Sequence, residues 1–500
     1  MSVFRASSAD PRGARKLLPP GIVLAGFVLS RVLYFALGVR FDASPLSWFW
    51  QYIDPALLKS DFLRSILYLH SQPPLFNVFL GTVVNLFPGR ETAVFAAAFL
   101  LCGVALALGL YLLMREAGVC ELTAAVLTTL FITSPACALY ENWLFYTYPV
   151  ATALVLSALF WARFSRTRRT RDALGLFSFL ALPALTWSLF HLAWLFLSAA
   201  ALLALSPGAR KRILAALAVP LLLVVLWYGK NLLIFGQFTA TTWTGLNFSK
   251  MTNGMLSAEE RWQLAQRGDI SGVSLVPPFR YVEDYRQYLE LPAPTGIPVL
   301  DEPLKQSGVP NFNHKLYIEA GRRSGVDAVR ILSLRPRAYL DGLALAWLTF
   351  LLPADAYELL LPNRRLIPGI ANSSNAVYNG RFRFGINHTL FNSDRAAYFR
   401  QSFLNIGFFT LAAYLAAFAF GVALLWRGRW RRHPAGPALL FLWFTVVFAS
   451  VLGNATEVGE NNRFRFALDP LALVLAACLS ERARARFARR PPAAAPRRRR

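Results

Sequence analysis

Two aspartates near the start of the chain, Asp42 and Asp54, are the first candidates for chemistry. A carboxylate that is placed beside a hydroxyl group can act as a general base and take its proton. A second interpretation is structural, because Asp54 stands directly before Pro55 and could cap a helix that begins with that proline. The sequence therefore leaves Asp42 and Asp54 as competing candidates for one catalytic role.

A proline-rich turn follows at His70-Ser71-Gln72-Pro73-Pro74-Leu75. The two prolines have fixed φ angles and no amide hydrogen, so they hold the chain rigid at this point. Such a turn could aim the His70 imidazole and the Gln72 amide at a bound phosphate or sugar. It could equally be a structural turn whose polar neighbours are solvated.

Arg31 is a charged residue at an apolar position. It sits well inside the apolar run 21–38, where an arginine costs about 2.5–3.5 kcal/mol on membrane-insertion scales. It therefore needs a partner or a watery cavity. An anionic lipid phosphate is one candidate partner, and an internal acid such as Glu141, which follows the apolar run 121–140, is another.

Three further side chains could bind a ligand. Arg463 and Arg465 stand just before the last apolar run, and the guanidinium fork matches the oxygens of a phosphate. Their alternative role is that of ordinary arginines at a membrane interface. His191 lies among aromatic residues and could line a cavity, although a single histidine in such surroundings can also be a packing residue.

The composition identifies the class of protein. The chain has 500 residues, of which 56% are hydrophobic and 16% charged, and a soluble protein could not shield that much apolar surface from water. The net charge of +25 falls mainly between apolar runs and at the chain ends. This pattern is typical of loops on the cytoplasmic side of a membrane, so the expected partner is the lipid bilayer and not a nucleic acid.

Ten apolar runs are long enough, or nearly long enough, to cross a bilayer. They cover 21–38, 92–114, 121–140, 147–163, 173–189, 191–206, 213–235, 402–425, 437–453 and 466–480. Two shorter runs, 74–88 and 339–353, are ambiguous. The basic stretches 163–171 and 426–432 stay cytoplasmic only if neither short run crosses the membrane.

The predicted topology has ten spans, both termini in the cytoplasm and a location in the inner (plasma) membrane. It treats 74–88 as a re-entrant or interfacial element and places a re-entrant element near 339–353. Aromatic and aliphatic residues at helical spacing predict an amphipathic helix on the membrane surface in the first outer loop. The segments placed outside are 39–91, the loop around 141–147, the long segment 236–401 and the loop 453–465.

The first outer loop resembles that of the GT-C superfamily of polyprenyl-phosphate-sugar-dependent glycosyltransferases, in particular bacterial relatives of protein mannosyltransferases and lipid A aminoarabinose transferases. In that superfamily an aspartate soon after the first span opens a juxtamembrane helix, and a His/Glu-x-Pro-Pro-Leu-like turn leads into the next membrane element. Asp42 and the string from His70 to Leu75 are similar to these features, which occupy only about residues 31–81. The usual acidic pair is absent, since Ala43 follows Asp42.

The resemblance implies an all-α, polytopic, GT-C-like bundle of about ten transmembrane helices. Its parts would be a catalytic membrane module over 1–235, an outer segment over 236–401, C-terminal membrane helices over 402–480 and a basic cytoplasmic tail over 481–500. The implied activity is inverting transfer of a sugar from a polyprenyl-phosphate donor to a lipid, glycan or protein acceptor on the outer face.

The resemblance also bears on two site assignments. Glu141 is similar to the acidic residue that the superfamily often carries at the outer end of the third span. Some members use a divalent cation held by carboxylates, for which Asp42, Asp54 and Glu141 are the candidates, but the sequence does not establish a metal or another cofactor.

Two other classes of function remain as alternatives. A lipid or solute transporter built from inverted repeats would show paired broken helices in two matching halves, and the sequence has no internal repeat. A non-catalytic membrane scaffold would use 236–401 to bind partners.

We predict that reporter fusions after Arg168 and Arg429 are cytoplasmic, and that fusions after Asp61, Glu302 and Asn375 are external. The reason is the distribution of lysine and arginine relative to the apolar runs. Dual phosphatase and β-galactosidase reporters would measure the side of each fusion. An external signal at Arg168 would contradict the ten-span topology.

Overall fold

The computed structural model describes residues 11–379, 406–432 and 435–488, and over these ranges the chain forms α-helices and short 3-10 helices without a β-strand. The predicted all-α, polytopic membrane fold is confirmed. Parts of the predicted outer segment and basic tail, residues 380–401 and 489–500, lie outside the described residues.

A helix, or a bent pair of helices, coincides with each of the ten predicted apolar runs. They are α1 (Pro11–Ala36), α6 (Glu91–Glu116), α7 (Glu121–Ile132) with α8 (Pro135–Glu141), α9 (Thr147–Thr167), α10 (Thr170–Thr186), α11 (Leu192–Leu205), α12 (Arg210–Phe235), α22 (Phe408–Leu425), α23 (Gly436–Thr456) and α24 (Asn461–Ala488).

Fewer than ten of these elements are long and apolar enough to cross a membrane alone. In the described part of the chain six helices meet that standard, and the bent pair α7 and α8 brings the number to seven. Among the others, α10 has 17 residues and α11 has 14, which is less than the about 20 residues of a straight span. The sequence predicts one span each for α10 and α11, but both helices are shorter than a straight span.

The two ambiguous apolar runs also form helices. α5 (Leu75–Leu86) has 12 residues and α18 (Pro336–Phe350) has 15, so their lengths are about 18 and 22 Å at a rise of about 1.5 Å per residue. Neither helix reaches across a hydrocarbon core of about 30 Å.

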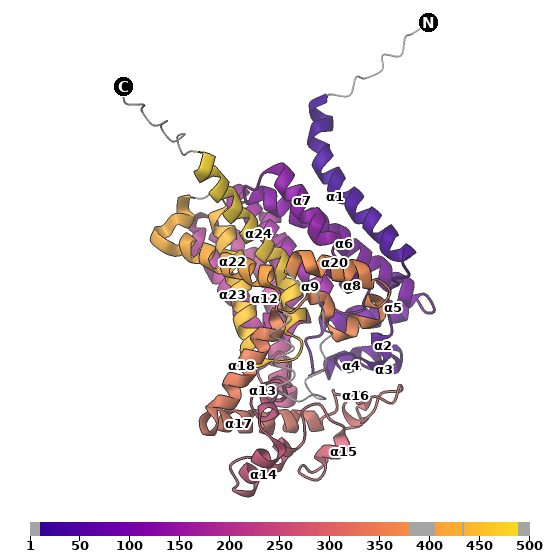
Figure 1. Cartoon of the computed structure of the whole chain (residues 1–500). Helices are drawn as coiled ribbons and strands as arrows, with labels where there is room; N and C mark the ends of the chain where they lie inside the picture. The colour runs from indigo at the N-terminus through magenta and orange to yellow at the C-terminus, as the bar shows by residue number, and fades with distance from the viewer. Residues whose placement is uncertain (1–10, 380–405, 433–434, 489–500) are drawn as a thin grey trace, which may run out of the picture.

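The elements are arranged with two distinct ends. Figure 1 shows that α1 begins and α24 ends at one end of the molecule, whereas α14, α15 and α17 lie at the opposite end. The part of the predicted outer segment that holds α14, α15 and α17 is therefore distant from the end of the bundle where the described chain begins and stops. Which end faces the cytoplasm remains a prediction from the charge distribution.

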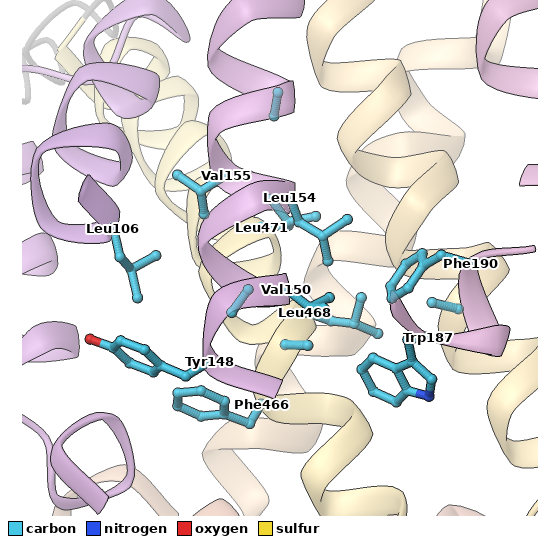
Figure 2. Close-up of a cluster of buried hydrophobic side chains, with 14 of the residues drawn as sticks. Leu106, Tyr148, Val150, Leu154, Val155, Trp187, Phe190, Phe466, Leu468 and Leu471 are labelled. Atoms are coloured by element: carbon cyan, nitrogen blue, oxygen red, sulfur yellow. The ribbon is translucent and has the colours of Figure 1, made fainter. Parts of the chain in front are cut away.

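One continuous hydrophobic core joins the first and the last membrane helices. α9 is the most enclosed of the six candidate spans, with 78% of its apolar window buried. Figure 2 shows Val150 and Leu154 of α9 close to Leu468 and Leu471 of α24. Because these side chains belong to one core, the N-terminal and C-terminal helices pack as a single bundle.

The outer segment contains small helices, one hydrophobic cluster of its own and a second cluster that also includes Val458 of the α23–α24 loop. The helices before α18 are α13 (Thr244–Met251), α14 (Ala258–Gln266), α15 (Val282–Tyr285), α16 (Pro298–Asp301) and α17 (Leu316–Leu334), and those after it are α19 (Leu361–Arg364) and α20 (Pro368–Asn379). α13 packs closely on α17 at Gly245 and Gly321, where an added Cβ would collide with backbone atoms of the facing segment, and at Gly325, where it would lie 3.2 Å from Gly245 Cα. Glycine is needed at this crossing because it alone lets two backbones approach so closely.

The first outer loop is helical but broken into short pieces: α2 (Pro45–Trp48), α3 (Pro55–Ser60) and α4 (Phe62–Leu67). Leu58 is fully buried against the bundle, while Leu63 is 80% exposed. The loop thus has an apolar outer face as well as a packed inner face, which fits a segment that lies along a membrane surface.

A buried ion pair ties α1 to the bent pair α7 and α8. Arg31 contacts both carboxylate oxygens of Glu141, with Nε to Oε1 at 2.8 Å and Nη2 to Oε2 at 2.7 Å. The Tyr148 hydroxyl donates a third hydrogen bond to Oε2 at 2.7 Å. Of the two partners that the sequence left open for Arg31, the structure contains the internal acid.

We expect Arg31→Met and Glu141→Gln to destabilise the folded protein strongly, because each leaves the other charge buried without its partner, at a cost of about 3–5 kcal/mol. Thermal unfolding of detergent-purified protein would measure the loss. The double variant should recover part of it, since no lone charge remains. Arg90→Met, at an exposed position, is the control, and equal losses in both arginine variants would contradict a special role for the pair.

Candidate active site

A cavity of about 400 Å³ lies where the predicted outer segments meet. Five regions line it: the first outer loop, the loop before α9, the turn between α10 and α11, the outer segment and the α23–α24 loop. The lining residues include 49–51, 72, 146, 187–189, 191, 238–241, 356–358 and 456–460. Segments that are distant in sequence but predicted to share one side of the membrane thus form one site.

Arg463 is the most deeply buried charge in this cavity. Its side chain is 1% exposed, forms an ion pair with Glu460 and donates from Nη1 to Thr147 Oγ1 at 3.2 Å. Its Nε–H has no hydrogen-bond partner among the residues that the structure describes, although an unpaired buried donor costs about 1–3 kcal/mol. The guanidinium therefore retains one free donor beside the cavity.

Aromatic rings surround the Arg463 guanidinium on several sides. Their centroids lie 4.8–5.9 Å from its central carbon and belong to Phe145, Tyr146, Trp187, Tyr357 and Phe464. Ring faces attract a cation and keep water away from it. The rings consequently fix Arg463 in a setting of low polarity, where its charge acts strongly on a bound anion.

Lys250 is the second cation in the cavity, and it forms an ion pair with Glu457. Lys250 comes from α13 of the outer segment, whereas Glu457 follows the end of α23. Burial raises the pKa of the Glu457 carboxyl to about 7, in spite of the opposing charge of Lys250. This pair connects the outer segment to the membrane bundle at the wall of the cavity.

Glu358 is the carboxyl group of the cavity that lacks an ion-pair partner among the described residues. It begins the 3-10 helix Glu358–Leu360 and is partly buried. Burial, with a further contribution from Glu460, raises the pKa of Glu358 to about 7. A carboxyl group of this kind can exchange a proton close to neutral pH.

Three of the predicted ligand-binding residues line this cavity: Arg463, Gln72 and His191. Gln72 is 5% exposed, and its Oε1 has no partner within the described part of the chain. His191 accepts the Ala193 amide hydrogen at its Nδ1 (3.2 Å) and so caps α11.

Arg465, in contrast, is directed away from the cavity. Its Nη1 donates to the carbonyl oxygens of Phe350 and Leu352 at 3.0 and 2.7 Å, and its Nε lies 3.2 Å from Asp469 Oδ1. These bonds satisfy carbonyls at the end of α18, which would otherwise lack partners. The structure thus separates Arg463 and Arg465, which the sequence treated alike.

His70 also lies outside the cavity lining and is fully buried. Its Nε2 contacts the Asn313 carbonyl oxygen at 2.9 Å, so Nε2 carries the hydrogen and Nδ1 accepts from the Thr242 hydroxyl at 2.7 Å. Burial lowers the pKa of His70 to about 3. The neutral imidazole therefore joins the first outer loop to the outer segment.

Neither predicted catalytic aspartate is among the residues that line the cavity. The Asp42 carboxylate accepts the Ser44 amide hydrogen at 2.9 Å. The Asp42 backbone forms hydrogen bonds with Asn142 and Leu144, and the residue lines a separate, smaller pocket. Asp54 caps α3 by accepting the Ala56 amide hydrogen at 2.9 Å, and it also accepts that of Gln306. The capping role weighed for Asp54 is present in the structure.

The remaining catalytic candidate, Glu141, is occupied by Arg31 and Tyr148 and does not line the cavity either. Among the described residues, no three His, Cys, Asp or Glu side chains are spaced to hold a metal ion. Asp42, Asp54 and Glu141 therefore do not fit the carboxylate cation site that the resemblance suggested.

Comparisons with known protein families and with curated proteins give no match. Among solved structures, the chain is similar to the Archaeoglobus fulgidus oligosaccharyltransferase, in a complex with Zn and sulfate (TM-score 0.38) and in a form tethered to an acceptor peptide with the NVT sequon (TM-score 0.35). Identity is 14% in both, over 92% and 93% of this chain. The chain spans about half of those chains, 49% and 50%.

Sequence reasoning missed Glu358, Lys250 and Gln51 as cavity residues. Glu358 stands shortly after the ambiguous apolar run 339–353, and a carboxylate directly beyond an apolar run was the available signal. No comparable sequence signal identifies Lys250 or Gln51. Their positions depend on how the outer segment and the first outer loop fold.

Proposed function

We propose that this chain is a membrane glycosyltransferase that transfers a sugar from a polyprenyl-phosphate donor to a hydroxyl group of a lipid, glycan or protein acceptor. The observation that carries the proposal is the cavity between the outer loops, which holds a buried guanidinium with a free donor and a carboxyl group without a cation partner. Phosphate recognition and proton removal are the two tasks that such a transfer requires.

Arg463 is the proposed phosphate ligand. Its free Nε–H can donate to a phosphate oxygen, and its positive charge is held in place by Glu460 and the surrounding rings. An anion that leaves the sugar gains negative charge in the transition state, and a fixed cation in a dry site stabilises that charge. Lys250, which also lines the cavity, adds a second positive charge.

Glu358 is the proposed general base. In its ionised form it would take the proton of the acceptor hydroxyl while the hydroxyl oxygen forms a bond to the anomeric carbon. The bond between that carbon and the phosphate oxygen breaks, and the electron pair leaves with the polyprenyl phosphate. Because the pKa of Glu358 is raised to about 7, the group is a stronger base than an ordinary glutamate and is still partly ionised at neutral pH.

Asp42 remains the rival for this role through its resemblance to the superfamily aspartate. Its carboxylate accepts a backbone amide hydrogen in a local turn and does not line the cavity. We therefore favour Glu358.

We expect Glu358→Gln to lower the transfer rate by about a hundredfold or more, because the amide cannot accept the acceptor's proton. In the wild type the rate should rise as pH increases through about 7, since the ionised carboxylate is the active form. Release of labelled sugar from a polyprenyl-phosphate donor in proteoliposomes would measure both effects.

Asp42→Asn and Glu290→Gln are the matched comparisons for that experiment. Asparagine can still accept the Ser44 amide hydrogen, so Asp42→Asn should fold and keep most activity. Glu290 is exposed and should tolerate the change. Loss of transfer in Asp42→Asn with full transfer in Glu358→Gln would move the catalytic role to the first outer loop.

We expect Arg463→Lys to weaken donor binding by about tenfold or more, because lysine loses the Nε–H and the planar fork. Arg465→Lys should keep donor affinity but lower thermal stability, since it loses the two bonds to the end of α18. Binding of polyprenyl phosphate and thermal unfolding in detergent would separate the two variants. Equal affinity in Arg463→Lys and wild type would exclude Arg463 from the phosphate site.

A further inference from the structure

Gln51, Gln72 and Arg463 line the cavity, and each has one buried polar atom without a hydrogen-bond partner among the described residues: Gln51 Oε1, Gln72 Oε1 and Arg463 Nε. Other unpaired atoms occur in the described part of the chain, but they belong to residues that do not line this cavity. Unpaired buried polar groups are costly, so three of them on residues that line one cavity favour a ligand that completes their hydrogen bonds.

The two glutamines are held by rigid surroundings. Asn77 brackets the backbone next to Gln51, since its Nδ2 donates to the Gln51 carbonyl at 3.0 Å and its Oδ1 accepts the Ile53 amide hydrogen at 2.9 Å. The Gln51 side chain also interacts with the Tyr146 phenol. Its amide oxygen is therefore presented from a fixed position.

Gln72 is fixed in a similar way by its neighbours in the chain. Thr241 donates from its hydroxyl to the Ser71 carbonyl at 2.6 Å, and Asn313 Oδ1 accepts the Ser71 amide hydrogen at 3.1 Å. Pro73 follows immediately and restricts the backbone of Gln72. The amide of Gln72 thus projects from a segment anchored on both sides.

The chemistry of the three atoms specifies the ligand. Two amide oxygens require hydrogen-bond donors, and the guanidinium Nε–H requires an acceptor, preferably an anionic one. A ring with hydroxyl groups joined to a phosphate supplies both kinds of group in one molecule. Trp187 and Trp50 on the cavity wall offer apolar surface for the less polar faces of such a ring.

We propose that Gln51 and Gln72 form the sugar subsite of the donor and select the sugar through its hydroxyl groups, while Arg463 binds the phosphate. This inference rests on the proposed function and assigns to each residue the part of the donor that it binds. A site that is built to pair with a hydroxyl group rejects a sugar whose hydroxyl is absent or points elsewhere, because its own polar atom then stays unpaired.

The test measures binding by quenching of tryptophan fluorescence, because Trp50, Trp187 and Trp243 line the cavity. The probes are undecaprenyl phosphate without a sugar and undecaprenyl phosphate linked to glucose, to galactose or to mannose. We expect Gln51→Met and Gln72→Met to weaken the best sugar-bearing probe by about tenfold and to reduce discrimination among the three sugars. Binding of the bare lipid phosphate should not change.

Two comparisons complete the design. Gln266→Met, at an exposed position in α14, should bind every probe like the wild type. Arg463→Lys should weaken the bare lipid phosphate and the sugar-bearing probes alike, because both carry the phosphate.

The outcomes that overturn the inference are distinct from those that overturn the proposed function. Unchanged sugar discrimination in both methionine variants, with a wild type that binds and transfers the sugar, would overturn the sugar subsite alone. Equal weakening of the bare lipid phosphate in the methionine variants would assign the glutamines a structural role and also overturn it. A wild type that binds none of the four probes would overturn both proposals.

Discussion

The cost of burying charge at one end of a membrane bundle is the constraint on which the rest of the site depends. Arg463 lies 1% exposed among aromatic rings and forms an ion pair with Glu460. A guanidinium in such a place is stable only while that carboxylate and the enclosing rings stay in position. Phe145, Trp187 and Tyr357, which come from three separate loops, are thereby held around one centre.

The same constraint explains how the outer loops are fastened to one another. Lys250 pairs with Glu457 and connects α13 to the end of α23, and His70 stays neutral because its burial makes the charged form unfavourable. The neutral ring can then accept from Thr242 and donate to Asn313 at the same time. Buried polar contacts of this kind tolerate little displacement, so they make the cavity a fixed feature of the fold.

Within the bundle, the Arg31–Glu141 pair performs the corresponding task for α1. Asp42 and Asp54 satisfy local backbone donors in the first outer loop. Asp42 and Asp54 thus have structural partners, whereas the carboxyl groups of the cavity come from the second half of the sequence. Glu358 and Glu457, whose pKa values are both raised to about 7, are the groups most able to exchange protons there.

The sequence by itself determined the membrane class and the positions of the apolar helices, and it predicts which segments share one side, because hydrophobicity and charge are local properties to which a bilayer responds directly. It also offered Glu141 as a partner for Arg31, Arg463 and Gln72 as ligand-binding residues, and His191 as a residue that could line a cavity. Tertiary structure alone decided that Arg465 turns to the end of α18, that His70 is enclosed, and that Glu358 and Gln51 reach the cavity. These outcomes depend on which loops meet. Packing, and the need of buried polar groups for hydrogen-bond partners, decide which residues pair when they are several hundred positions apart in the sequence.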